Sequence, residues 1–235
     1  MARSAQRFIP SPANYPIPPP CVVWTCVETV KADGARLDAI ILNAGIMGLP
    51  ELRQAHGYEL QFFTNHIGHF LLATGLLGRL ADGGRAVALS SSAHQFAPKG
   101  GIEFDNLTGE RGYSPWRAYG QSKLANLLFA KELARRLAGT GKTANAVHPG
   151  VIMTNLGRSV ASPMVALGKL VEPLFLKTIP QGAATQSFVA THPSLEKISR
   201  EYFVDCNIGK SSALSRDPVL AARLWDESER IVEQL

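Results

Sequence analysis

Cysteine is scarce in this chain of 235 residues, which has three: Cys21, Cys26 and Cys206. An odd and small number gives no paired disulfide framework and predicts a reducing compartment. No stretch reaches the roughly 18 consecutive apolar residues of a membrane-spanning helix, and no apolar run precedes a small-residue cleavage site near the N-terminus. We therefore expect a cytoplasmic protein without a transmembrane segment.

Clusters of basic side chains are also missing, although the formal net charge is +5. No run of lysine and arginine is longer than the pair Arg135-Arg136. Such diffuse basicity is typical of a solvated surface, so we do not expect nucleic-acid binding. With 46% hydrophobic residues, the chain can bury a sizeable core in one α/β domain or two small ones.

Prolines dominate the first twenty residues and remove backbone donors there. We expect residues 1–21 to be a disordered, proline-rich tail and residues 22–235 to form the folded domain. In that domain, short apolar runs alternate with segments of helical spacing. We predict strands over 38–42, 85–89, 143–147 and 201–204, and helices over 22–36, 57–79, 115–137, 181–191 and 218–233. This alternation indicates βαβ units and a parallel sheet covered on both faces.

Small or polar residues follow three of the predicted strands: Asn-Ala-Gly at 43–45, Ser-Ser-Ser at 90–92 and His-Pro-Gly at 148–150. In open α/β sheets, ligands bind outside the carboxyl ends of the strands, so these segments should line one crevice. His66 and His69 are spaced like a metal-binding pair, but no carboxylate or cysteine lies near them in the sequence. We expect no metal site.

Tyr119 and Lys123 stand four residues apart on the predicted helix 115–137 and therefore share one face. A nearby ammonium group stabilises a phenolate, so it should lower the phenol pKa from its usual value of about 10. A phenol tuned in this way can act as a general acid or base. The pair alone is weak support, because chance supplies one in about one chain of five.

Four segments in combination resemble the short-chain dehydrogenase/reductase family, in its retinol dehydrogenase-like and WW-domain oxidoreductase-like branch: residues 64–70, 89–94, 119–126 and 148–150. The resemblance implies a Rossmann-like doubly wound parallel sheet. It also implies an NAD(P)(H)-dependent oxidoreductase that interconverts a carbonyl and an alcohol, with NADP slightly preferred over NAD. The apolar residues of 155–180 fall where this family has its substrate lid and suggest a retinoid, steroid or lipid aldehyde. A plain core helix is the alternative for that segment.

The resemblance assigns four catalytic residues. Tyr119 would be the general acid/base, and Lys123 would lower its pKa and hold the nicotinamide ribose. Ser91 would hydrogen-bond the substrate oxygen, with its two neighbours in the serine run as alternatives. Asn65 would position a water that relays protons to Lys123. A serine run can also simply cap a strand, and an asparagine can lie on a helix surface.

The same resemblance implies a set of cofactor contacts, some made by backbone where a small residue allows close approach. They are Asn43, Ala44, Gly45, Tyr119, Lys123, Pro149, Gly150, Ile152 and Thr154. The small apolar carbonyl or alcohol substrate would be the main partner, and a homodimer through the long helices is conceivable. An ordinary strand-end turn is the alternative for residues 43–45.

One part of the family pattern is missing, namely the first strand with its Thr-Gly-x-x-x-Gly-x-Gly turn and the helix that receives the pyrophosphate. Residues 43–45 come about 40 residues early by the family's layout. We therefore expect an N-terminally truncated domain whose sheet lacks the first βαβ unit, with strand 38–42 left as a bare apolar edge. A catalytically impaired remnant that acts as a binding or regulatory partner is the alternative function.

The missing turn generates a binding prediction. Without most pyrophosphate contacts, the 235-residue chain should bind NADPH weakly. A fluorescence titration with NADPH measures this, and a dissociation constant in the micromolar range or below would show the prediction to be wrong.

Overall fold

A five-stranded sheet forms the centre of the computed structural model, which describes residues 20–151 and 177–235. Its strands are β1 (Leu37–Leu42), β4 (Leu80–Leu89), β5 (Thr143–His148), β6 (Tyr202–Val204) and β7 (Asn207–Ile208), in the spatial order β1-β4-β5-β6-β7. Neighbouring strands are parallel from β1 to β6, and β7 runs antiparallel to β6. The predicted α/β fold with a mainly parallel, Rossmann-like sheet is confirmed, and β7 is an addition to it.

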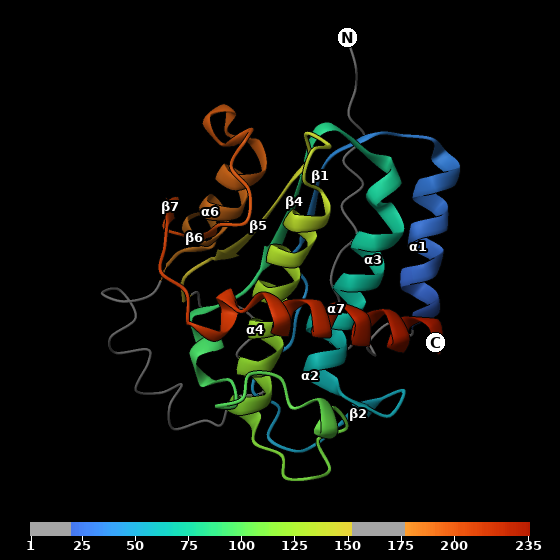
Figure 1. The fold of residues 1–235 in the computed structure, drawn as a ribbon, viewed down its shortest axis with the longest axis vertical. Coiled ribbons are helices and arrows are strands. Elements are labelled where there is room, and N and C mark those ends of the chain that lie inside the picture. Colours follow the sequence, from blue (N-terminus) through green and yellow to red (C-terminus); the bar gives the residue numbers. More distant parts are fainter. Residues whose placement is uncertain (1–19, 152–176) are drawn as a thin grey trace.

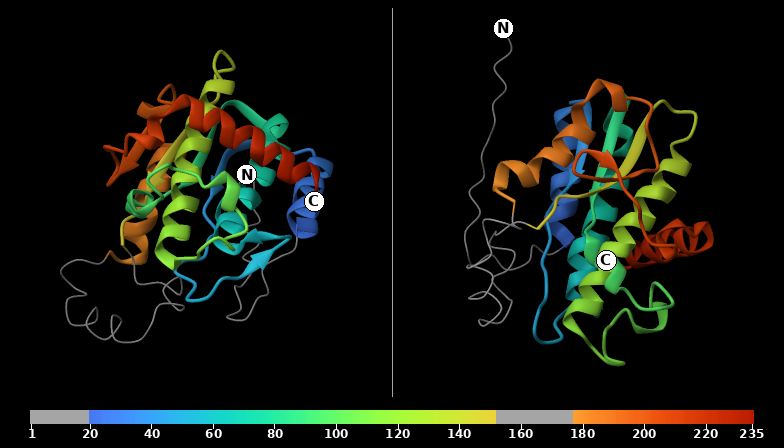
Figure 2. Two further views of the ribbon diagram at one scale, coloured as in Figure 1. Left: turned by 60° about the horizontal axis from the view of Figure 1, so that its bottom comes forward. Right: turned by 90° about the vertical axis from the view of Figure 1, so that its left-hand side faces the viewer.

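Helices lie on both sides of this sheet (Figures 1 and 2). One side carries α1 (Pro20–Asp33), α3 (Gly68–Leu76), α4 (Pro115–Arg136) and α7 (Pro218–Glu233), and the other carries α6 (Ile179–Thr191). α1 therefore begins inside the predicted tail, whose first 19 residues lie outside the described part of the chain. No helix among the described residues has the length and apolar character that crossing a membrane requires.

Alternate residues of β4 pack into two different hydrophobic cores, because successive side chains of a strand point to opposite faces of the sheet. Ala86 and Ala88 face a cluster that joins α1, α3, α4 and α7. Within that cluster the rings of Phe129 and Trp225 stack with centroids 5.7 Å apart. Val87 and Leu89 face the opposite cluster, under α6. Buried apolar contacts on both faces thus hold β4 and its carboxyl end in place.

The predicted helix 57–79 begins later than expected. A hairpin of β2 (Gln54–Ala55) and β3 (Tyr58–Glu59) comes first, and Gly57 turns between them with a φ of +80°. The helix then runs as α2 (Leu60–Phe62), a π-helical turn η1 (Phe63–Ile67) and α3. A π-helical turn inside a helix often marks a functional site, and this one contains Asn65.

β1 is the edge strand of the sheet, as the sequence indicates for a bare strand. Among the described residues it pairs only with β4. Ile40 is buried under α3, whereas the side chain of Ile41 on the other face is 43% exposed. The expectation that helices cover both faces of the sheet holds only in part at β1, where Ala39 packs against the cluster under α6 and Ile41 stays exposed.

Exposed apolar edge strands promote association between chains. Ile41→Lys should therefore reduce concentration-dependent light scattering of the protein, and it should change the free energy of unfolding by only about 0.5 kcal/mol, as is usual at exposed positions. Ile208→Lys is a matched control, because Ile208 is 59% exposed on the two-residue strand β7 at the other sheet edge. Equal scattering by Ile41→Lys and the unchanged protein would contradict an association through β1.

Candidate active site

Hydrogen bonds tie the carboxyl end of β4 to the middle of α4. The Leu89 carbonyl accepts from Lys123 Nζ at 3.2 Å and from Asn126 Nδ2 at 2.8 Å. Ser90 Oγ donates in return to the Lys123 carbonyl at 2.7 Å. These three bonds are buried, so they fix the position of α4 along the strand.

Tyr119, Lys123 and Ser91 converge at this junction. Lys123 Nζ lies 5.6 Å from the centroid of the Tyr119 ring, so the two side chains share a helix face as predicted. The Ser91 side chain lies close enough to the Tyr119 hydroxyl to lower the pKa of that phenol. Ser91 also caps the short helix η3 (Ser92–Phe96), because its Oγ accepts from the Ala93 amide at 3.1 Å. Of the three serines in the run, Ser91 is therefore the one in contact with Tyr119.

Gly120 allows this close approach. A Cβ added at Gly120 would lie 2.7 Å from backbone atoms of Ala93, Phe96 and Ala97. Any side chain at that position would therefore push η3, and Ser91 with it, away from Tyr119.

The protonation of the site differs from the sequence prediction. Burial raises the pKa of Tyr119 to about 12, and the nearby Ser91 side chain offsets this shift only in part. Burial also lowers the pKa of Lys123 to about 8. The expected lowering of the phenol pKa by Lys123 is not found, because burial and the Ser91 side chain determine the shift of Tyr119 and Lys123 does not contribute to it.

Asn65 connects the loop after β1 to α4. Its Oδ1 accepts from the Ile46 amide at 2.8 Å, and its Nδ2 donates to the Ile46 carbonyl at 2.9 Å and to Ser122 Oγ at 2.9 Å. Gly45 lies beside this group, since a Cβ there would be 3.0 Å from Asn65 Oδ1 and 3.6 Å from Lys123 Nζ. Asn65 is fully buried, so the alternative of a surface position does not hold.

The other expected cofactor residues lie at the carboxyl ends of β1 and β5. Asn43 and Ala44 are exposed at the end of β1. Pro149 and Gly150 follow β5, and Gly150 has a φ of +92°. Ile152 and Thr154, like most of the apolar segment 155–180, lie outside the described residues.

Lys177 is a residue of this region that sequence reasoning missed. Its Nζ donates to the Pro149 carbonyl at 3.3 Å and forms an ion pair with Asp205. A Cβ on Gly150 would displace the flexible end of the Lys177 side chain, and the φ of +92° at Gly150 favours glycine there. No sequence signal identifies Lys177, because it stands 27 residues after Gly150 and belongs to no motif.

The histidines near the site form hydrogen bonds that support the fold. His66 is fully buried, bonds Ser228 Oγ at 2.8 Å and has its pKa lowered by burial to about 3. His94 Nε2 accepts from the Ser212 amide at 3.1 Å. In residues 20–151 and 177–235, no three His, Cys, Asp or Glu side chains form a group that could hold a metal ion.

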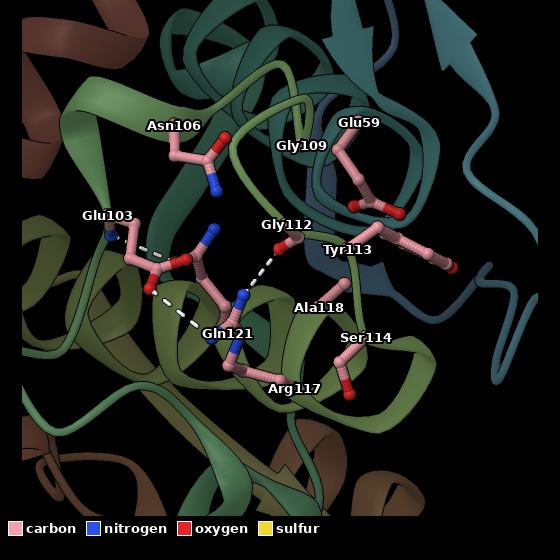
Figure 3. Close-up of a pocket in the computed structure, with 10 residues that line it drawn as sticks. All are labelled: Glu59, Glu103, Asn106, Gly109, Gly112, Tyr113, Ser114, Arg117, Ala118 and Gln121. Carbon is pink, nitrogen blue, oxygen red and sulfur yellow. Dashed lines mark hydrogen bonds and ion pairs between the residues drawn. The ribbon is translucent and has the colours of Figure 1, made fainter.

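A small polar cavity lies beside the first turn of α4 (Figure 3). Its volume of about 20 Å³ suits one water molecule and excludes a dinucleotide or an apolar aldehyde. It is lined by Glu59, Glu103, Asn106, Gly109, Gly112, Tyr113, Ser114, Arg117, Ala118 and Gln121. The cavity is therefore a feature of the supporting structure.

Comparison with known proteins identifies the family. The family model for short chain dehydrogenases matches residues 22–164. The chain belongs to the short-chain dehydrogenase family. Human retinol dehydrogenase 14 is 42% identical over 211 residues, which cover 88% of this chain and 62% of that protein. The chloroplastic short-chain dehydrogenase TIC 32 A of Brassica napus is 45% identical over 208 residues, covering 85% and 65%.

Solved structures of the family share the fold. An uncharacterized protein from Mycobacterium Paratuberculosis is 34% identical with a TM-score of 0.67, over 89% of this chain and 72% of that one. An angucycline C-6 ketoreductase with bound NADP is 25% identical with a TM-score of 0.56, over 78% and 68%. This short-chain dehydrogenase chain thus spans 62–65% of the length of the curated relatives named above.

The described residues fit one half of a nicotinamide dinucleotide. Gly45 leaves the space beside Lys123 free of a side chain, and Lys123 has one acceptor, Leu89, for its three possible donors. A ribose hydroxyl is a suitable further acceptor. In contrast, no glycine-rich turn between a strand and a helix N-terminus occurs in residues 20–151 and 177–235 to bind a pyrophosphate.

Lys123→Met should change how stability depends on pH. The folded-state pKa of Lys123 is about 8, against an ordinary value of 10.5. Between these values the unfolded chain holds a proton that the folded chain has released, so stability rises with pH. Lys123 should contribute a rise of about 2 kcal/mol from pH 8 to pH 10 in the unchanged protein, and this contribution should be absent from the variant.

Guanidinium denaturation over this pH range measures the difference. Lys197→Met, at an exposed position, is the control and should keep the rise. If Lys123→Met and the unchanged protein show the same dependence, burial does not set the pKa of Lys123.

Proposed function

We propose that this protein is an oxidoreductase that reduces a carbonyl to an alcohol with NADPH, with Tyr119 as the general acid. The observation that carries the proposal is the convergence of Tyr119, Ser91 and Lys123 at the carboxyl end of β4. Ligands of parallel α/β sheets bind at this edge. Family membership and the retinol dehydrogenase relatives support the same reaction class.

Tyr119 holds its proton at neutral pH, because its pKa is about 12. A carbonyl oxygen placed between the Tyr119 and Ser91 hydroxyls would accept a hydrogen bond from each. The phenol would then give up its proton as negative charge develops on that oxygen. This protonation state favours reduction over oxidation of the alcohol, which needs the phenolate as a base.

Lys123 and Asn65 would serve the proton path and the ribose. The bound dinucleotide would supply the hydride. Lys123 would hold a ribose hydroxyl and, through its positive charge, stabilise the phenolate that Tyr119 leaves behind. Asn65, fixed by Ile46 and Ser122, would hold a water next to Lys123. The turn at Pro149 and Gly150 would line the nicotinamide side, and Asn43, Ala44 and Gly45 would pack beside the adenine ribose.

NADP is our preferred cofactor and an apolar aldehyde our preferred substrate class. An angucycline C-6 ketoreductase of the same fold binds NADP. Relatives at 42% identity are named retinol dehydrogenases, so a retinoid, steroid or lipid aldehyde is the class to test. We also propose a cytoplasmic location and a homodimer. The alternative of an impaired remnant rests on the missing pyrophosphate turn.

Tyr119→Phe should lower turnover of retinal with millimolar NADPH by about a hundredfold or more, because it removes the acidic proton. The KM for NADPH should stay within about twofold, since the ring and Lys123 remain in place. The rate is followed by loss of NADPH absorbance at pH 7.

Tyr58→Phe, a half-buried tyrosine in β3, is the control and should keep the turnover of the unchanged protein. Full turnover by Tyr119→Phe would exclude Tyr119 as the acid. A folded, unsubstituted chain with no turnover of any apolar aldehyde would favour the remnant.

A further inference from the structure

Three polar side chains, Gln61, Asn65 and His69, stand four residues apart along the continuous helix formed by α2, η1 and α3. All are buried, with exposures of 0%, 0% and 5%. Each meets a different residue of the segment 44–48, which follows β1 and begins among the expected cofactor contacts.

The partners alternate along that segment. Gln61 Oε1 accepts from the Gly48 amide at 2.8 Å, and Asn65 bonds both backbone groups of Ile46. The His69 ring lies against the backbone of Ala44, although neither ring nitrogen makes a hydrogen bond of normal geometry. The hydrogen bonds to the segment 44–48 therefore come from Gln61 and Asn65, and His69 contributes only packing.

The spacing has a simple geometric reason. Four helical residues rise about 6 Å, and two residues of extended chain span about 6.6 Å. Side chains at every fourth helical position can therefore each reach every second residue of an extended segment that runs the opposite way. The segment 44–48 leaves the extended conformation at its end, where Gly48 has a φ of +62°. Asn65, the middle residue of the three, lies in the π-helical turn η1.

Gln61 differs from Asn65 and His69 because it also forms hydrogen bonds with the start of α4. Its Nε2 donates to Tyr113 Oη at 3.0 Å and to the Pro115 carbonyl at 3.2 Å. Tyr113 Oη in turn donates to the Leu49 carbonyl at 2.7 Å, which returns the network to the loop after β1. Figure 3 shows Tyr113 near Glu59, the residue that caps the same helix by accepting from the Phe62 amide at 2.8 Å.

We infer that Gln61 is a positioning residue of the active site. It holds the segment 44–48, on the cofactor side, against the beginning of α4, which carries Tyr119 on the acid side. The inference rests on the proposed function for its kinetic consequence. Its structural part, the fixed relation between the two segments, stands on the hydrogen bonds of Gln61 alone.

Gln61→Leu keeps the side-chain size and removes the hydrogen bonds of Gln61 to Gly48, Tyr113 and Pro115. The Gly48 amide therefore loses its acceptor. Amide hydrogen exchange of residues 43–50 should then become about tenfold faster or more. Gln121→Leu is a matched control, because Gln121 is 6% exposed and its Oε1 accepts from the Glu103 amide at 2.9 Å, away from the site. It should speed exchange around Glu103 and leave residues 43–50 protected.

The kinetic readout separates positioning from general destabilisation. In Gln61→Leu the KM for NADPH should rise by about tenfold, with kcat at saturating NADPH within about twofold. Gln121→Leu should leave this KM unchanged. A lower kcat at unchanged KM in Gln61→Leu, as expected of a smaller folded fraction, would overturn the kinetic part.

The structural part is decided by exchange alone. Unchanged protection of residues 43–50 in Gln61→Leu, or equal loss in both variants, would overturn it. Where Gln61→Leu fails to fold, Gln61→Glu keeps the acceptor for Gly48, loses the donors to Tyr113, Pro115 and Glu59, and places a second carboxyl group beside Glu59. Faster exchange should then appear at Tyr113 and in the first turn of α4 and not at residues 43–50. A protein without turnover refutes the proposed function but leaves the exchange result decisive.

Discussion

The shared carbonyl of Leu89 is the contact on which the site depends. It accepts from both Lys123 and Asn126, while Ser90 returns a bond to the Lys123 backbone, so the end of β4 and the middle of α4 move as one body. Ser91 follows Ser90 directly, and Tyr119 lies one helical turn before Lys123, so the same hydrogen bonds fix their relative positions. The junction is stable because β4 has apolar cores on both faces, and because Gly120 lets η3 pack directly on α4. A buried lysine is costly by itself, and these surrounding contacts hold it in place.

The sequence could predict the features that depend on residues close together in the chain, and it could not predict those that depend on distant segments. The strand ends and the common face of Tyr119 and Lys123 depend on periodicity over a few residues, and the structure has them where expected. The pKa of Tyr119 depends on burial by distant segments, so its direction could not be read locally. Lys177 lies far along the chain from the turn that it contacts. The helix predicted over 57–79 begins only at Leu60, where its apolar spacing begins, because the positive φ of Gly57 lets the preceding residues form a hairpin.

The two sides of the site are supported differently. The acid side, with Ser91 and Tyr119, is anchored by a strand that has neighbours on both edges. The cofactor side begins at β1, which pairs only with β4 among the described strands and leaves Ile41 exposed. α1 compensates on one face, where Gly75 lets Val27 pack closely against α3. Polar side chains of the neighbouring helix then determine the path of residues 44–48, a role that strand pairing cannot fill in a loop.

Burial moves Tyr119 and Lys123 in opposite directions on the pH scale, and the combination has a chemical meaning. Both shifts favour the neutral form: the phenol keeps its proton, and the ammonium comes close to releasing one at neutral pH. A negative charge that develops on a substrate oxygen beside Tyr119 would reverse the balance, because it favours both the charged lysine and transfer of the phenolic proton. Under the proposed function, Tyr119 and Lys123 would thus reach their catalytic protonation states during the reaction. That property comes from how deeply α4 is buried, and it explains why the same tyrosine and lysine pair on an exposed helix would have no comparable chemistry.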